Sequence, residues 1–101
     1  MDAYSYTTVT VEPDGTATVH VSMRPDEQVR VWCTPGRDRA QISLAHARAD
    51  VVITPTNPTA PTAGDVRVAR RLAESFATFA AEVERLHAQN HAAESAEDSA
   101  A

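Results

Sequence analysis

One cysteine and four histidines are the residues of this 101-residue chain best suited to nucleophilic or acid–base chemistry. Cys33 lies near the end of a predicted strand, on the parity that points inward, so we expect a small buried thiol. No motif supplies the adjacent base that a nucleophile needs. His20 falls on a predicted polar sheet face, where no carboxylate is clearly placed to orient it. We therefore assign no catalytic residue and favour a protein that is not an enzyme.

Two further histidines, His87 and His91, are four residues apart in a predicted helix, the spacing that lets two imidazoles share one metal ion. Glu84 or Glu94 would add a carboxylate ligand. Because there is no HExxH motif and the pair lies near a fraying helix end, we favour surface histidines. We predict no metal and no cofactor.

The basic residues are all arginine, and their distribution limits the possible partners. Arg37 and Arg39 flank Asp38 in a predicted turn, which is either a solvated loop or, with Arg30 and Arg48, a patch for an anion or phosphate. The net charge of −5 lies mostly in the last ten residues, so the rest is nearly neutral and lacks the surplus of a non-specific nucleic-acid binder. Abundant alanine without lysine indicates a high-GC genome, such as that of an actinobacterium.

The first half of the chain has the alternation of β-strands. Residues 4–11 and 16–23 flank the turn sequence EPDG and predict a hairpin, and residues 28–34 predict a third strand. Residues 39–53 predict one bulged strand or two short ones. Ile42 and Leu44 have the opposite parity to Val51 and Ile53, which requires a break near residues 46–50.

A proline-rich linker at 54–62 precedes a predicted helix over 63–91, which Thr62 and Asp65 begin as a capping box. We expect an α+β fold, with one antiparallel sheet of four or five strands over 4–54 followed by one long C-terminal helix (ββββα). Residues 1–91 form a single domain in this prediction. The small acidic residues 92–101 are predicted to be a disordered tail.

The sheet and helix each carry an apolar face, which predicts that the helix covers the sheet. The expected sheet face is Val9, Val11, Ala17, Val19, Val21, Met23, Val29, Val31, Ile42 and Leu44. The helix has a heptad-like seam of Ala69, Leu72, Phe76, Phe79, Val83, Leu86 and Asn90. A helix of about 27 residues is roughly 40 Å long, against ~26 Å for an eight-residue strand. Unless the helix ends early or bends, Phe79, Val83 and Leu86 need another partner, and we expect a homodimer.

The opposite sheet face is rich in threonine but also carries aromatic and basic residues. It is either a solvated face or a surface for a ligand, a protein partner or a second subunit. Our candidates for a binding surface, including the following turn, are Tyr4, Tyr6, His20, Arg30, Trp32, Arg37 and Arg39.

These features favour a small non-enzymatic interaction module, acting as a homodimer or accessory subunit that binds a protein partner. Strands followed by one dimerising helix are similar in outline to the PC4-like coactivator fold, which implies single-stranded nucleic-acid binding on the aromatic and arginine face as an alternative. A small ligand-binding protein or enzyme is a second alternative. The start of the chain does not resemble a signal peptide and no segment has the ~20 apolar residues of a membrane helix, so we expect a cytoplasmic protein without membrane contact.

Overall fold

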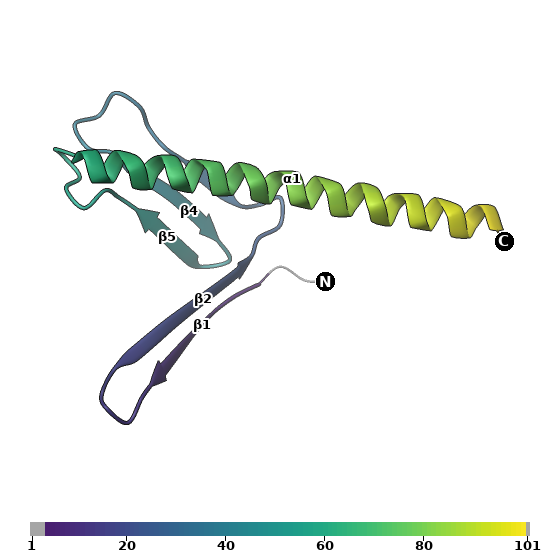
Figure 1. Cartoon of the computed structure of the whole chain (residues 1–101), viewed down its shortest axis with the longest axis horizontal. Helices are drawn as coiled ribbons and strands as arrows, with labels where there is room; N and C mark the ends of the chain where they lie inside the picture. Colours follow the sequence, from purple (N-terminus) through teal and green to yellow (C-terminus); the bar gives the residue numbers. More distant parts are fainter. Residues whose placement is uncertain (1–3, 101) are drawn as a thin grey trace. The chain divides into compact units, whose positions relative to one another are not determined.

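The computed structural model describes the backbone of residues 4–100 and the side chains of residues 6–94, and its architecture is α+β (Figure 1). Two compact units divide the chain, residues 1–60 with all the strands and residues 61–101 with the helix. The elements are β1 (Tyr4–Val11), β2 (Ala17–Arg24), β3 (Arg30–Trp32), β4 (Ile42–His46), β5 (Ala49–Ile53) and α1 (Ala63–Ala100).

Strands β1 and β2 form the predicted hairpin as a two-stranded antiparallel sheet. Its turn has the positive-φ glycine and the local aspartate hydrogen bonds that the sequence EPDG predicts. Gly15 has a positive φ of 89°, and its N–H donates to the Glu12 carbonyl at 2.9 Å. The Asp14 carboxylate accepts the backbone N–H of Thr16 at 3.0 Å and its hydroxyl at 2.7 Å. The register therefore follows from local turn chemistry.

Strands β3, β4 and β5 form a second, three-stranded antiparallel sheet in that order. The expectation of one continuous four-stranded sheet is therefore wrong: the described strands are divided between two sheets. The physical reason lies in the segment after Arg24, where Pro25 has no N–H to donate and Asp26 turns the chain by accepting the Gln28 N–H at 2.9 Å. Pairing with β2 ends there, and β3 is only three residues long.

The parity change between Ile42 and Ile53 is explained by a hairpin, as the two-strand alternative predicts. Ile42 is opposite Ile53 and Leu44 is opposite Val51 in the β4–β5 register, so these four side chains share one face. The connecting residues Ala47 and Arg48 both have positive φ, 48° and 68°. This is the pattern of a type I′ turn, which normally selects Asn-Gly because side chains with a Cβ disfavour the left-handed region.

Helix α1 begins with the predicted capping box. The Asp65 N–H donates to Thr62 Oγ1 at 3.1 Å, and the Thr62 N–H donates to the Asp65 carboxylate at 2.9 Å. The helix continues beyond the predicted end at His91 to Ala100. Alanine and glutamate, which dominate residues 92–100, are both strong helix formers, and this explains the continuation.

No apolar residue is buried among the described side chains. The valines expected at the covered sheet face are exposed on the hairpin, with Val9, Val11, Val19 and Val21 between 55% and 69% accessible. A two-stranded sheet has no second layer of its own to bury such a face. The chain therefore has large apolar surfaces that are available for contact.

Candidate functional site

Four of the predicted binding residues lie on β3 and in the loop that connects it to β4. A cleft of about 270 Å³, which we call the Trp32 cleft, is lined by Trp32, Thr34, Arg37, Asp38, Arg39, Gln41 and Ser43. Arg30 lies beside it, two residues before Trp32 on β3. Glycine permits the turn that leads into the loop, because Gly36 has a positive φ of 78°.

Trp32 and Arg30 share one face of β3 because they are two residues apart. The Arg30 guanidinium lies over the indole ring, with its central carbon 4.8 Å from the ring centroid. This cation–π contact holds the Arg30 guanidinium against the indole ring. Trp32 nevertheless remains 42% exposed. The cleft thus combines a flat aromatic surface with two arginines and one acidic residue, Asp38, and the third arginine, Arg30, lies beside it.

The floor of the cleft includes Ser43, which is only 3% exposed. Its neighbours across the sheet are Trp32 on β3 and Val52 on β5. The Gln41 amide donates to Ser43 Oγ at 3.3 Å. Because a hydroxyl both donates and accepts, Ser43 can still donate its own hydrogen. Polar side chains thus line both the loop and the strand sides of the cleft.

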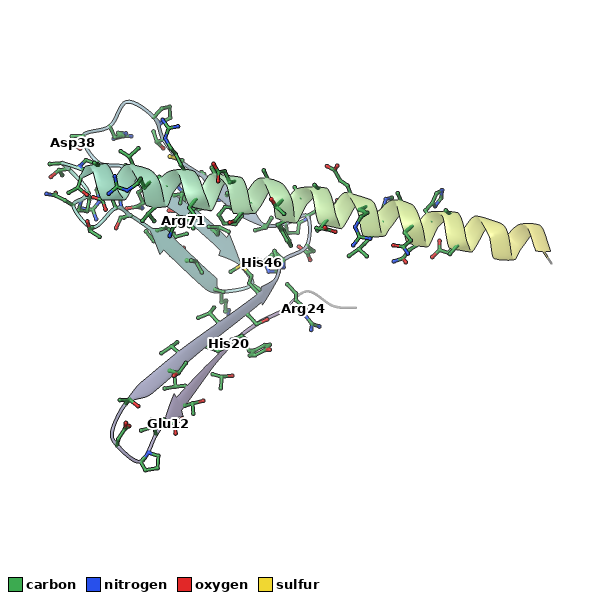
Figure 2. All side chains as sticks on the ribbon, in the orientation of Figure 1. Glu12, His20, Arg24, Asp38, His46 and Arg71 are labelled. Carbon is green, nitrogen blue, oxygen red and sulfur yellow. The ribbon has the colours of Figure 1, made fainter. Side chains whose placement is uncertain are left out.

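The buried histidine at the end of β4, His46, is paired with an aspartate (Figure 2). The sequence patterns do not predict this pair. His46 Nε2 is 2.9 Å from Asp26 Oδ1 and 3.3 Å from the Asp26 backbone nitrogen. A carboxylate only accepts hydrogen bonds, so the shorter contact requires a proton on Nε2, and Nε2 then cannot accept the Asp26 N–H at the longer distance. The neutral form with that proton leaves Nδ1 as an acceptor, and Nδ1 is buried without a hydrogen-bond partner among the described residues.

Two aspartates in turns have their pKa held below the usual range. The Gln28 backbone N–H lowers the pKa of Asp26 most, followed by the hydrogen bond from His46. The backbone N–H and then the hydroxyl of Thr16 lower the pKa of Asp14. Both carboxylates are thus stabilised in the charged form by donors that fix the backbone. Their role here is to hold turns in place.

Two other predicted surface residues lie on the hairpin. Tyr6 and His20 have ring centroids 6.0 Å apart with the planes tilted by 38°, and their strand positions place both on the polar face. They belong to a different sheet from Trp32, so the expectation of one continuous aromatic face is wrong. The side chain of Tyr4, the remaining candidate, is outside the described residues.

The expected dimer side chains on α1 are exposed and follow one stripe. Phe76 and Leu86 are each 48% accessible, Val83 is 49% and Phe79 is 66%. His87 and His91 are stacked with centroids 6.1 Å apart on the same helix. No group of three or more potential metal ligands occurs among the described residues. Cys33, expected to be buried, is exposed because β3 ends at Trp32 before reaching it.

Comparisons with known proteins add no family. No protein-family model, curated protein or solved structure is significantly similar to this chain. Within the part of the chain that the structure describes, α1 is too rich in charged residues to qualify as a membrane-spanning helix, and there is no other helix that could.

Proposed function

We propose that this chain is a small non-enzymatic interaction module that forms a homodimer through α1 and binds a protein partner. The observation that carries the proposal is the exposed apolar stripe on a helix that is longer than any strand of the fold. The 38 residues of α1 give a length of about 57 Å at ~1.5 Å per residue. The longest strands have eight residues and span only about 26 Å.

The difference in length between α1 and the strands leaves part of the helix beyond any sheet, wherever the helix lies. Whatever part of α1 a sheet covers, about half of its length extends beyond the end of that sheet. Phe76, Phe79, Val83 and Leu86 follow the alternating three- and four-residue spacing of a helix–helix seam. Full burial of such side chains is worth about 1.5–3 kcal/mol each. A second copy offers an identical stripe, so a two-fold dimer buries both.

A charge placed in the stripe tests this dimer. Leu86→Glu should raise the dissociation constant by at least about 100-fold, because the carboxylate loses its hydration when the stripe is covered. Ala88→Glu adds the same side chain two residues away, at an exposed position outside the stripe, and should leave the mass unchanged. Light scattering over a concentration series measures both variants. If both variants dissociate equally, or if neither dissociates, the dimer does not form through this stripe.

The Trp32 cleft supports a protein partner with an acidic segment. Arg30 lies over the exposed indole, Arg37 and Arg39 line the same cleft, and Asp38 is the one acidic side chain in that lining. Arginine binds carboxylates in a planar, two-pronged geometry, and aromatic residues provide contact area at interfaces. We infer that a segment with carboxylates and an apolar or aromatic residue occupies the cleft.

Fluorescence of the sole tryptophan, Trp32, tests the cleft directly. Titration with an acidic ten-residue peptide containing one aromatic residue should change its emission. Replacing Arg37 and Arg39 by glutamine should weaken binding at least about tenfold, since each lost charged contact costs about 1–3 kcal/mol. Arg70→Gln together with Arg71→Gln, both exposed on helix α1, is the control that also removes two charges and should bind normally. Unchanged emission with the peptide contradicts this partner.

Single-stranded nucleic acid is the second candidate, favoured by the stacking of Arg30 on Trp32 at 4.8 Å. Bases stack on exposed aromatic rings while arginines hold the phosphates. An oligo-dT of ten nucleotides, titrated at low salt in the same assay, separates the two. Oligo-dT binding that weakens steeply with salt, without peptide binding, favours the nucleic acid. Peptide binding alone favours the protein partner.

A further inference from the structure

The stripe of α1 has an internal order that bears on how two copies are arranged. Taking Ala69 as the first position of a heptad, the four a positions are Ala69, Phe76, Val83 and Asn90, and the four d positions are Leu72, Phe79, Leu86 and Ala93. The helix is continuous through all of these residues and extends beyond them to Ala100. The first six residues of the helix, 63–68, and the cap at Thr62 precede the repeat.

The residue types at these positions are those of a particular assembly. A β-branched residue at a, here Val83, combined with leucine at d, here Leu72 and Leu86, favours two parallel strands. Asn90 is polar and occupies the fourth a position. In a parallel, in-register pair its amide lies beside the same amide of the second copy, where one donates and the other accepts. In an antiparallel pair the amide faces a different residue of the seam and loses this partner.

The flanking positions are compatible with the parallel arrangement. A g residue then faces the e residue of the following heptad on the other helix. This places Glu82 opposite His87 of the second copy, and Gln89 opposite Glu94. Glu82 also contacts Arg85 of its own helix at 2.6 Å. Neither of these cross-helix pairs brings two like charges together.

We propose that α1 forms a parallel, in-register, two-stranded coiled coil in which Asn90 pairs with Asn90 of the second copy. This inference rests on the proposed homodimer and specifies its partner geometry. Both N-terminal units are attached to the same end of the coil, because each is followed directly by the start of its helix. The dimer therefore carries two copies of the Trp32 cleft, in units attached at that end of the coil. A partner with two acidic segments gains avidity by binding both clefts.

Directed disulfide formation distinguishes the parallel from the antiparallel arrangement. In a full chain carrying Cys33→Ser, the substitution Ala93→Cys places one thiol at a d position of each helix. Only the parallel register brings these two thiols within the ~5.5–6 Å Cα separation that a disulfide needs. The control is Ala88→Cys, an exposed position on the outer side of the same helix. In a glutathione redox buffer, Ala93→Cys should form at least about ten times more covalent dimer than the control.

The mass of each reduced variant by light scattering, with helix content by circular dichroism, completes the test. Preferential cross-linking of the Ala93→Cys dimer supports the parallel coil. A non-covalent dimer of full helix content with no preferential cross-link overturns the parallel register but leaves the homodimer intact. A folded monomer with no cross-link overturns both proposals.

Asn90→Ile gives an independent check on the amide pair. Removing the buried amides should raise the melting temperature of the assembly while allowing other oligomers or registers, because a polar a residue specifies register at a cost in stability. Glu74→Ile, on the outer face of the helix, is the control. A melting temperature that falls with Asn90→Ile, or that changes equally in both variants, contradicts a seam position for Asn90.

Discussion

At the scale of single residues, the contact between His46 and Asp26 joins the loop after β2 to the end of β4. His46 is 9% exposed, whereas the Asp26 side chain is 56% accessible. The pair therefore consists of a buried ring held by a solvated carboxylate. Because Asp26 also accepts the Gln28 N–H, one carboxylate fixes both the loop and the histidine. The pair thus ties the loop after β2 to the end of β4 within the N-terminal unit.

Acidification should weaken this contact in a predictable direction. The pKa of Asp26 is lowered in the folded chain, so the stabilisation it gives is complete above its unfolded pKa of about 3.9 and is lost as the pH falls through the folded value. Asp26→Asn should therefore melt at a lower temperature than the native chain at pH 7, and the difference should shrink as the pH falls below about 3.8. Thermal melts across this range measure the effect. A difference that grows in acid contradicts it.

At the scale of elements, the turn between β4 and β5 holds two residues in a conformation that they disfavour. Left-handed backbone costs a residue with a Cβ about 1 kcal/mol or more, and Ala47 and Arg48 both adopt it. The register of the hairpin, in which Ile42 faces Ile53, compensates for this strain because it places the apolar residues on one face.

Arg48→Gly should relieve part of the strain. We expect the free energy of unfolding to rise by about 0.5–1 kcal/mol, since glycine adopts positive φ without the Cβ penalty. Ala45→Gly, within β4, is the matched control and should lower it by a similar amount. Denaturant melts of the two variants provide the measurement. Destabilisation by Arg48→Gly would show that the turn is not strained at that position.

Elements with local signals were predictable from the sequence, and contacts between distant residues were not. The β1–β2 hairpin and the capping box at Thr62 follow from side chains within a few residues of each other. The division into two sheets depends on where strand pairing stops after Arg24, and alternation alone does not reveal it. In the site, Arg30 and Trp32 share a predictable face. The pair of His46 with Asp26 spans 20 residues and has no sequence signature.

At the scale of the whole molecule, the chain has two amphipathic units and no buried apolar side chain among its described residues. The hairpin exposes a row of valines and α1 exposes a row of phenylalanine, valine and leucine. A stable domain normally buries such rows in a core of its own. In the proposed homodimer, the covered stripe of α1 supplies buried apolar area that the single chain lacks.

The mass of the native chain in solution tests the homodimer most directly. Sedimentation equilibrium from about 1 to 100 μM, a range that spans typical interface affinities, should give twice the 10.9 kDa chain mass at the upper end. Dissociation towards one chain mass on dilution is compatible with the same model. A mass of 10.9 kDa at every concentration, from a chain whose helix content matches α1, contradicts the account.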